Sequence, residues 1–451
     1  MQAKQQSYKL KAIVVGLLIL VLLIPLSLVN STIKERANYR QEAVAAVAES
    51  FAGPQILAGP VLVVPYAETQ QLQANDAFGK PVLRTVRTAR HWTYFPATLS
   101  LHGKLLPSVR RRGLHEVRVY ELQASMLAHF EQTLPEDPDG VRAIGRPYLS
   151  VSIADVRGLV GTPVLSVDRV STPLEQGVGS HRAGGGLHAP LPINASSGQK
   201  IRFDVQAQLN LSGTESLAIA PVADSNRISL DSSWPHPQFA GRFLPRSHRI
   251  GSTGFNALWE LSSLAAGTQL QYVDGAGDTA LDSLKVGLVE PVNIYSQADR
   301  ASKYGILFVL LTFLGFFMFE LLKRLSIHPI QYGLVGLALA IFFLLLLSLS
   351  EHMEFWVAYV VAAGACIGLL GVYLAAVLRS RVRGGGFAAG LTLLYVALYG
   401  LLVSEDNALV LGSLMLFAIL AALMLVTRRI DWYAPAPGHP ESEIAVQGAT
   451  P

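Results

Sequence analysis

The stretch AIVVGLLILVLLIPLSLV, residues 12–29, contains no charged side chain. A helix of this length covers nearly all of a hydrocarbon core about 30 Å thick, because each residue adds about 1.5 Å. After a long polar segment, residues 30–303, five further apolar runs follow at residues 304–322, 332–350, 355–378, 384–403 and 408–426. Only 15% of the residues are charged, against about 25% in soluble proteins. We therefore expect a polytopic α-helical membrane protein with six transmembrane helices, arranged as one plus five.

The basic residues between these runs indicate the orientation of the chain. They lie in the tail 1–11 and after the second, fourth and sixth runs: Lys4, Lys9, Lys11, Lys323, Arg324, Arg379, Arg381, Arg383, Arg428 and Arg429. The alternate loops, SEHME (350–354) and SEDN (404–407), hold acids but no Lys or Arg. Short cytoplasmic loops carry the excess of Lys and Arg, so both termini are predicted to be cytoplasmic and residues 30–303 external. The net charge of +4 then reflects topology and predicts no binding to nucleic acid.

The first apolar run is predicted to be an uncleaved anchor. Its length exceeds the 7–15 residues that are usual in a signal peptide, and no A-x-A-like site follows it, although VNS at residues 29–31 is a weaker candidate for cleavage. The single cysteine, Cys366, lies in the fourth run, so we expect the external domain to fold without a disulfide. The Pro, Ala and Glu content of residues 434–451 predicts a disordered cytoplasmic tail.

The external segment is predicted to be rich in β-strands. In IRFDVQAQLNL, residues 201–211, apolar and polar residues alternate strictly, which is typical of a strand with one wet face. Weaker alternation occurs at residues 117–122, 149–153 and 228–230. The stretch LSLHGKL, residues 99–105, suggests two strand pieces around a His-Gly turn.

These strands place a β-rich (α+β) domain between the first and second membrane helices. The Ala- and Glu-rich residues 32–50 indicate that the first helix continues outward. The external segment exceeds about 250 residues, which is long enough for two lobes, and the sequence leaves open whether it forms one lobe or two.

The stretch SSWPHPQFAGRFLP, residues 232–245, concentrates aromatic residues among prolines. Pro235 and Pro237 remove backbone donors and favour extended geometry in the residues before them. We interpret the segment as a stiff polyproline-like link that presents Trp234 and His236 on different sides. Trp234, His236 and Phe239 are therefore candidates for a recognition ridge. The alternative is that Trp234 and Phe239 fill the core, which is the commoner role of isolated aromatic residues.

No metal or cofactor site is predicted. A zinc site needs three or four convergent ligands, and the proline-rich stretch offers one histidine. HEVRV, residues 115–119, lacks the second histidine of the metalloprotease motif. His181 and His188 share a Gly-rich loop and are interpreted as unpaired surface histidines. DGAGDTALD, residues 274–282, lacks the EF-hand spacing and is interpreted as a polar turn.

No catalytic residue is predicted either. STIK, residues 31–34, matches the S-x-x-K motif of penicillin-interacting serine enzymes, but the partner motifs S-D-N and K-T-G are missing. The sequence contains no G-x-S-x-G motif, no P-loop and no dinucleotide-binding glycine motif in a strand-to-helix context. We therefore expect a protein without enzymatic activity.

Two features stand out within the apolar runs. Glu320 is the one acid there, and an intramembrane carboxylate marks a proton relay or substrate site by default. Lys323 and Arg324 follow at i+3 and i+4, so an ion pair at the membrane interface is the preferred interpretation.

Glycines at spacings that let helices pack closely are Gly364, Gly368, Gly371, Gly386 and Gly390. One run, a large insert and five runs do not form the paired halves of repeat-type transporters.

Taken together, eight segments of the chain resemble the CreD family of inner-membrane proteins. They are ERANYR (35–40), GPQILAGPVLVVP (53–65), LEQG (174–177), LNLSGTESL (209–217), SSWPHPQFAGRFLP (232–245), DRASKYGILFVLLTFLGFFMFE (299–320), HPIQYGLVGLALAIFFLLLLSLSEH (328–352) and RRIDWYA (428–434). The resemblance implies the inner membrane of a Gram-negative bacterium, with residues 30–303 in the periplasm. It also implies production under the Cre two-component regulatory system, and effects on envelope integrity, colicin tolerance and the response to β-lactams. It implies no reaction and no catalytic residues.

Three hypotheses for the function follow. The first is a non-enzymatic protein in the lipid bilayer whose periplasmic domain contacts envelope proteins, lipid or peptidoglycan. The second is a membrane-tethered enzyme acting on peptidoglycan or a lipid-linked precursor, which would need titratable groups converging in an external cleft. The third is a modulator of a membrane sensor kinase. The sequence leaves the oligomeric state open.

Overall fold

The computed structural model describes residues 2–75, 81–288, 294–323, 327–378, 380–404 and 408–428. The chain divides into two compact units. The helical unit comprises Met1–Asn38 and Val292–Pro451, and the sandwich unit comprises Tyr39–Pro291. The tail that is predicted to be disordered, residues 434–451, lies outside the described residues.

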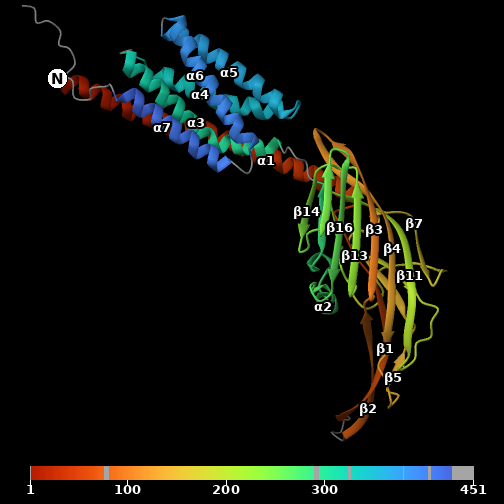
Figure 1. The fold of residues 1–451 in the computed structure, drawn as a ribbon. Coiled ribbons are helices and arrows are strands. Elements are labelled where there is room, and N and C mark those ends of the chain that lie inside the picture. Colours follow the sequence, from red (N-terminus) through yellow and green to blue (C-terminus); the bar gives the residue numbers. More distant parts are fainter. Residues whose placement is uncertain are drawn as a thin grey trace, which may run out of the picture. The chain divides into compact units, whose positions relative to one another are not determined.

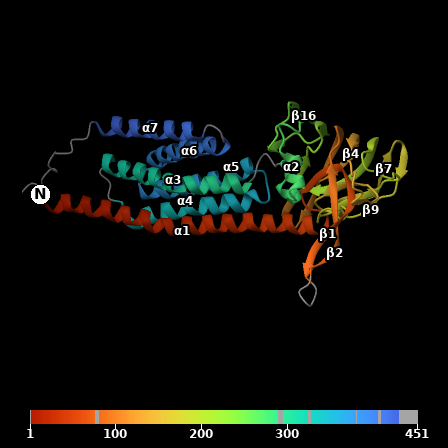
Figure 2. The same cartoon turned by 90° about the horizontal axis from the view of Figure 1, so that it is seen from below.

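Long apolar helices that lie alongside one another build the helical unit (Figure 2). Their bounds are α1 Gln2–Ser50, α3 Ile294–Lys323, α4 Pro329–Ser350, α5 Phe355–Val377, α6 Arg381–Val403 and α7 Ala408–Thr427. Within the described residues, five of these helices, α1 and α3 to α6, are long and apolar enough to cross a membrane. In α7 the apolar stretch is Val410–Ala421, which is shorter. Five membrane-spanning helices are thus supported, and the sixth crossing stays a prediction.

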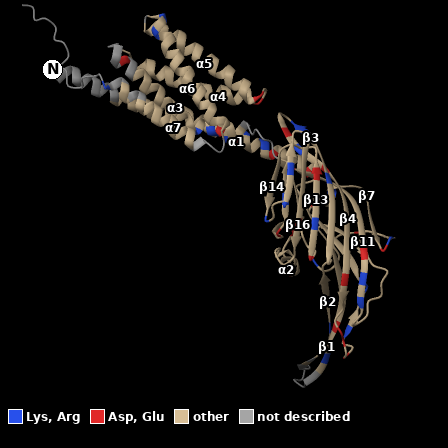
Figure 3. Cartoon of the chain, viewed as in Figure 1, with Lys and Arg blue, Asp and Glu red and all other residues tan. Residues whose placement is uncertain are grey.

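Aromatic rings pack where α3, α4, α5 and α6 meet. The Tyr395 ring contacts Phe308 and Phe342, with centroids 4.6 and 4.7 Å away, and Tyr359 donates its hydroxyl to the Tyr395 carbonyl at 2.7 Å. Charged residues are rare along these helices and lie mostly toward their ends (Figure 3). Close packing and interhelical hydrogen bonds of this kind hold helices together in lipid, where the hydrophobic effect does not.

Two β-sheets form the sandwich unit (Figure 1). Among the described residues, one sheet has nine strands in the order β14-β17-β12-β1-β6-β10-β9, with β2 and β5 also paired to β1. Its strands are β1 Gln55–Asn75, β2 Pro81–Tyr94, β5 Arg142–Ile144, β6 Tyr148–Ile153, β9 Glu175–Gln176, β10 Gly186–Pro190, β12 Ser216–Ala220, β14 Pro237–Gly241 and β17 Leu284–Leu288.

The second sheet has eight strands in the order β15-β16-β13-β3-β4-β11-β7-β8, again counting the described residues. Its strands are β3 Thr98–Arg112, β4 His115–Thr133, β7 Leu159–Val167, β8 Val170–Thr172, β11 Lys200–Thr214, β13 Ser225–Ser232, β15 Ser247–Gly251 and β16 Gly254–Ser262. The short helices are α2 Thr268–Val273, η1 Val156–Gly158 and η2 Asp278–Ala280.

The two sheets enclose one large apolar core. It takes Leu62 and Val151 from the nine-stranded sheet and Leu101, Phe130 and Trp259 from the eight-stranded sheet, all buried. Facing sheets bury their inward residues in this way in β-sandwiches. Whether this segment forms one lobe or two is open from the sequence, and the structure has one, because Tyr39–Pro291 is one compact unit with a shared core.

The predicted strands at residues 117–122, 149–153, 201–211 and 228–230 lie in β4, β6, β11 and β13, whereas one predicted turn is wrong. The alternation at residues 201–211 is confirmed, because β11 buries every second residue over most of its length. The predicted turn at residues 99–105 is wrong, because His102 and Gly103 lie in the middle of β3. A Cβ at Gly103 would lie 2.7 Å from Leu230 Cδ2 and 2.9 Å from Leu122 Cδ1. The glycine thus makes room for two core leucines of the neighbouring strands.

Helix α1 ends at Ser50, which confirms that the first helix continues through residues 32–50. A polar network holds the end of this helix against the sandwich. Asp155 accepts from the Gly53 amide at 3.0 Å and pairs with Arg157, whose guanidinium also donates to the Glu49 carbonyl. Arg157 lowers the pKa of Asp155 to about 2. Gln55 completes the network by donating to the Asp155 and Ser212 carbonyls.

Candidate functional site

A half-buried polar cluster lies on the outer face of β6. Its centre is His181, in the loop between β9 and β10. The His181 Nδ1 atom is 3.3 Å from the Tyr148 hydroxyl, and its Nε2 atom is 3.1 Å from the Tyr272 hydroxyl. The His91 ring packs edge-on at 5.8 Å between centroids. Hydrogen bonds through one imidazole therefore link strand β6, this loop and helix α2. We call Tyr148, His181, Arg182, Tyr272 and Asp278 the histidine–tyrosine cluster.

The sequence of β6, YLSVSI, explains how this loop comes so close. All six residues of the strand are buried. Its apolar residues face the core, and Tyr148, Ser150 and Ser152 face the loop. Ser150 is small enough for the backbone to approach, and it donates to the Val178 carbonyl at 2.9 Å. A Cβ at Gly179 would lie 2.3 Å from the Tyr148 ring, so this position in the Gly-rich loop must lack a side chain.

Arg182 and Asp278 extend the cluster toward η2. The Arg182 guanidinium lies 4.3 Å from the centroid of the Tyr272 ring, donates to the Ala276 carbonyl at 2.7 Å and is 3.0 Å from Asp278 Oδ1. The two charged side chains are only 8% and 12% exposed. Three buried atoms, Arg182 Nη1, Asp278 Oδ1 and Ser152 Oγ, make no hydrogen bond within the described part of the chain. The ion pair is therefore close but not aligned as a hydrogen bond.

Burial shifts the titration of these groups. Desolvation, together with the charges of His91 and Arg182, lowers the pKa of His181 to about 4. Desolvation raises the pKa of Asp278, against the opposing effect of Arg182. Desolvation likewise raises the pKa of Tyr272. Near neutral pH the His181 imidazole is thus uncharged, and each of its nitrogens faces a tyrosine hydroxyl.

This cluster corrects the expectation that His181 and His188 are unpaired surface histidines. His188 contacts the Gly177 carbonyl at 2.9 Å and Glu175 at 3.3 Å. The predicted polar turn at residues 274–282 also has a partner, since Asp278 pairs with Arg182. Within the described residues, no three His, Cys, Asp or Glu side chains are grouped to hold a metal ion. These polar groups contact other groups of the same domain. Such an arrangement is better suited to holding segments of the chain together than to general acid–base catalysis.

A second polar arrangement covers the outward face of the eight-stranded sheet. We call the outward side chains of β11, β4, β3 and β13 the polar face. The strand register aligns them in rows that cross the sheet in the order β11, β4, β3, β13: Asp204, His129, Thr98, Ser225; then Gln206, Leu127, Ser100, Arg227; then Gln208, Ser125, His102, Ser229; then Asn210, Gln123, Lys104, Asp231. Hydroxyl, amide and imidazole groups predominate on this face.

The first two rows of the polar face line a hollow of about 380 Å³. Asp204 Oδ1 lies 2.6 Å from His129 Nδ1 at one end. Arg227 lies at the other end and pairs with Glu260 of β16 at 2.7 Å. Leu127, between them, is 54% exposed. We call this hollow the groove. Its size is within the range of about 300–1,000 Å³ that is usual for ligand sites.

The third and fourth rows bring a serine, a histidine and an aspartate together. His102 Nδ1 is 2.9 Å from Ser229 Oγ, and His102 Nε2 is 3.7 Å from Asp231 Oδ2. Acyl transfer also needs donors aimed at the developing oxyanion, usually backbone amides. Here the residues sit in paired strands, whose amides already serve the sheet. The arrangement therefore has a nucleophile and a base without an oxyanion site.

The proline-rich stretch differs from its prediction in one respect. Trp234 and His236 do not point to different sides, because their rings are in edge contact at 6.0 Å and the Trp234 indole donates to the His236 carbonyl. The Arg118 guanidinium lies 4.3 Å from the Trp234 ring. Phe239 contacts the buried Trp259 at 5.7 Å. Trp234 is half-buried, His236 is exposed, and a recognition role for this stretch stays a prediction.

Glu320 lies buried in α3. Its carboxylate accepts from the Tyr332 hydroxyl at 2.7 Å and from the Ile327 amide at 3.2 Å. The predicted ion pair involves Lys323 and Arg324, whose side chains lie outside the described part of the chain. Hydrogen bonds from α4 and from the residues before it therefore hold this carboxylate in place.

The glycines differ in their surroundings. A Cβ at Gly371 would lie 3.3 Å from Ala388 Cβ, whereas Gly364, Gly368, Gly386 and Gly390 have no atom of the described chain within 4 Å of that position. These four glycines therefore do not mark close helix contacts within the described chain. Helices α5 and α6 instead come close together at Gly384, where a Cβ would lie 2.6 Å from Ala375 Cα.

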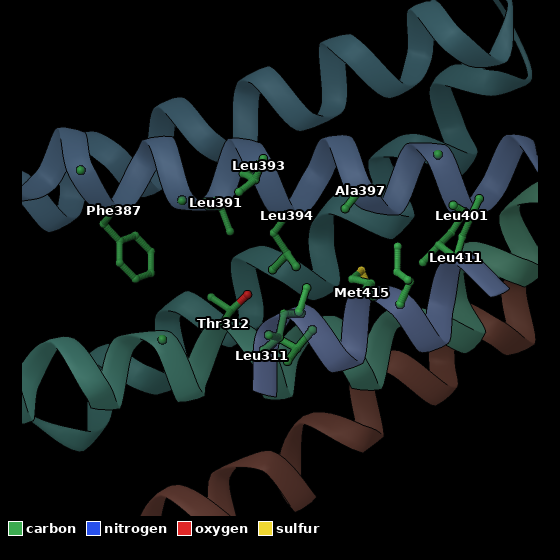
Figure 4. A pocket seen from close by; sticks show the side chains of 17 residues that line it. Leu311, Thr312, Phe387, Leu391, Leu393, Leu394, Ala397, Leu401, Leu411 and Met415 are labelled. Carbon is green, nitrogen blue, oxygen red and sulfur yellow. The ribbon is translucent and has the colours of Figure 1, made fainter. Parts of the chain in front are cut away.

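Gly386 and Gly390 line a hollow of about 740 Å³ between α3, α6 and α7. Figure 4 shows Leu311 and Thr312 of α3, Leu394 of α6 and Met415 of α7 around it. Its lining is almost wholly apolar, as is usual for a surface that contacts lipid tails.

Five span-length apolar helices and a large β-sandwich, both counted within the described ranges, define the class of this chain as a multi-pass membrane protein with one large β-rich domain. The family model for inner membrane protein CreD matches residues 7–433. The chain is also 36% identical over 422 residues to inner membrane protein CreD of Escherichia coli (strain K12), covering 92% of each chain. The chain therefore belongs to the CreD family of inner membrane proteins, as the resemblance implied.

Solved structures of zinc metallopeptidases align only loosely. The M1 zinc metallopeptidase of Deinococcus radiodurans covers 43% of this chain, with 8% identity and a TM-score of 0.19. A mutant of the two-domain M1 zinc metallopeptidase bound to L-arginine gives 9% identity and the same TM-score. This chain spans 42% of each of those proteins. At such TM-scores the likeness supports no conclusion about this chain.

Proposed function

We propose that this chain is a multi-pass inner-membrane protein that maintains the integrity of the cell envelope through contacts of its sandwich unit with other envelope components. In this proposal both termini are cytoplasmic, six helices cross the membrane and residues 30–303 lie in the periplasm. The charge pattern of the short loops supports the orientation. Membership of the CreD family supports the membrane location.

The observation that carries the proposal is the polar face with its groove. Four neighbouring strands present hydroxyl, amide and imidazole groups outward, and the hollow among them is open to small ligands. The His102–Ser229–Asp231 geometry is the one observation that favours the alternative of a periplasmic enzyme. Contact is the better-supported function, since neither polar arrangement pairs a nucleophile with an oxyanion site among the described residues.

The orientation can be tested with reporters fused after residue 200. Alkaline phosphatase needs an oxidising compartment to form its disulfides, so it should be active there, and a cytoplasmic fluorescent reporter should stay dark. The same reporters fused at the C-terminus should behave in the opposite way. An active cytoplasmic reporter at residue 200 would overturn the topology.

The role can be tested by deleting the corresponding gene and measuring sensitivity to detergent, colicin and β-lactams. Full-length protein should restore resistance. A chain in which the first two rows of the polar face are replaced by lysine should reach the membrane in equal amounts and fail to restore it. Full restoration by that variant would contradict a contact role for this surface. Modulation of a sensor kinase predicts a different result, namely altered transcription of the regulon without any dependence on the polar face.

A further inference from the structure

The charged side chains around the groove already have partners within the sheet. Asp204 is hydrogen bonded to His129 at 2.6 Å. Arg227 pairs with Glu260 at 2.7 Å, and Glu260 also binds Arg246 at 2.6 Å. A strongly charged ligand would have to break these pairs, and a phosphate or an acidic peptide would also meet the Asp204 carboxylate. The groove therefore suits an uncharged ligand.

The centre of the groove combines one apolar side chain with hydrogen-bonding neighbours. Leu127 projects from β4 with 54% of its surface exposed. Its partners across the sheet are Gln206 on β11 and Ser100 on β3, both exposed. A pyranose ring has the complementary character, since its C–H face is apolar and its rim carries hydroxyls. An N-acetyl group adds a methyl, which matches Leu127, and an amide, which matches Gln206.

We propose that the groove binds an uncharged glycan whose sugars carry N-acetyl groups. This inference rests on the proposed function, because it names the ligand class of the polar face. The glycan lies across β11, β4, β3 and β13, with an acetamido methyl on Leu127 and its amide against Gln206. Ser100, Thr98 and Ser225 hydrogen bond the hydroxyl rim. In rows three and four, Gln208, Ser125, Asn210 and Gln123 continue the same hydrogen-bonding chemistry, so a chain of several sugars is accommodated better than one sugar.

The test uses the full-length chain in lipid nanodiscs, titrated with N,N′,N″,N‴-tetraacetylchitotetraose and, in parallel, with maltotetraose. The first sugar should bind saturably, and the second at least about tenfold more weakly, because it lacks the acetamido groups. Gln206→Ala should weaken binding about fivefold, as expected for the loss of one hydrogen bond. Ser100→Phe fills the hollow and should abolish binding. Gln71→Ala, an exposed glutamine of β1 away from the polar face, is the matched control and should bind as the unaltered chain does.

Thermal unfolding of each variant shows whether it is folded. Equal binding of both sugars would overturn the acetamido assignment, and binding that survives Ser100→Phe in a folded chain would overturn the site. Absence of binding by the unaltered chain would overturn the whole inference. A failure of this inference can be distinguished from a failure of the proposed function, because the reporter fusions and the resistance assays involve no added sugar.

Discussion

The Nε2 atom of His181 lies 3.1 Å from the Tyr272 hydroxyl, and the two rings are stacked with centroids 6.0 Å apart. Through this pair a titratable side chain of the loop between β9 and β10 is attached to helix α2. Protonating the imidazole places a cation beside Arg182 and His91, which already lower its pKa. The attachment is therefore expected to weaken in acid.

The first prediction concerns this pH dependence. The folded pKa of His181, about 4, lies below the unfolded value near 6.5, so the unfolded chain binds the proton first as the pH falls. The contribution to stability is complete above pH 6.5 and is lost between pH 6.5 and pH 4. Because the ring is only partly buried, we expect a loss of about 1–2 kcal/mol. Thermal unfolding of the full-length chain, followed by tryptophan fluorescence, should show a midpoint temperature that decreases as the pH is lowered from 6.5 to 4.

His181→Gln is the matched variant, because glutamine keeps polar contacts and does not titrate. Its unfolding midpoint should change less between pH 7 and pH 4 than that of the unaltered chain. Asp278 acts with the opposite sign, since its raised pKa favours the folded state as the pH falls. Asp278→Asn should therefore steepen the acid loss. If the unfolding midpoints of all three chains depended on pH in the same way, the roles assigned to His181 and Asp278 would be contradicted.

The second prediction concerns the ion pair of Arg182 and Asp278. Arg182→Ala leaves the Asp278 carboxyl buried without a cation and also removes the contact with Tyr272. We expect a loss of about 3 kcal/mol of unfolding free energy, because breaking a buried pair leaves an uncompensated charge. The double variant with Asp278→Ala should lose less than the sum of the two single changes. Additive losses, measured by thermal unfolding, would show that the two side chains do not interact.

Glu320 and Tyr332 give the third prediction, which separates two roles of a carboxylate in the membrane. Tyr332→Phe removes the donor 2.7 Å from Glu320 and should lower the stability of the helical unit by about 1–3 kcal/mol. The same change at Tyr304, a half-buried tyrosine of α3, is the control and should have little effect. Stability in detergent is the measurement.

Glu320→Gln then tests whether the charge itself matters. Glutamine can accept from the Ile327 amide with its one oxygen, while its amide nitrogen donates to the Tyr332 hydroxyl oxygen in place of the present bond, so a structural carboxylate should tolerate it in both stability and resistance assays. A variant that stays folded and fails to restore envelope resistance would indicate a proton-relay role instead.

Local pattern is sufficient to predict much of the fold. Strict alternation reveals β11, because a strand with one wet face imposes a period of two on the sequence. Uninterrupted apolar runs likewise reveal the membrane helices, because a lipid environment requires apolar side chains along the whole span. His102 and Gly103 mislead because a His-Gly pair has the composition of a turn. Only the leucines of β4 and β13 explain why Gly103 lies within a strand.

The histidine–tyrosine cluster is not predictable from any short motif. Tyr148, His181 and Tyr272 are far apart in sequence, and only the pairing of β6 with β10 and the position of α2 bring them together. A usable signal is nevertheless present. YLSVSI alternates apolar residues with Ser, and a strand with small polar residues on its second face indicates that another segment covers it.

The last prediction concerns the glycines of α5 and α6. Gly384→Ala would place a Cβ 2.6 Å from the Ala375 backbone, so the two helices must separate, and we expect a clear fall in the unfolding temperature in detergent. Gly364→Ala meets no atom of the described chain within 4 Å and gains helix propensity of up to about 1 kcal/mol, so its midpoint should stay or rise. If Gly364→Ala instead destabilised the protein, with loss of a larger species in size-exclusion chromatography, this face of α5 would contact a second copy. Because the two changes add the same methyl group, the difference between their unfolding temperatures measures the effect of helix packing.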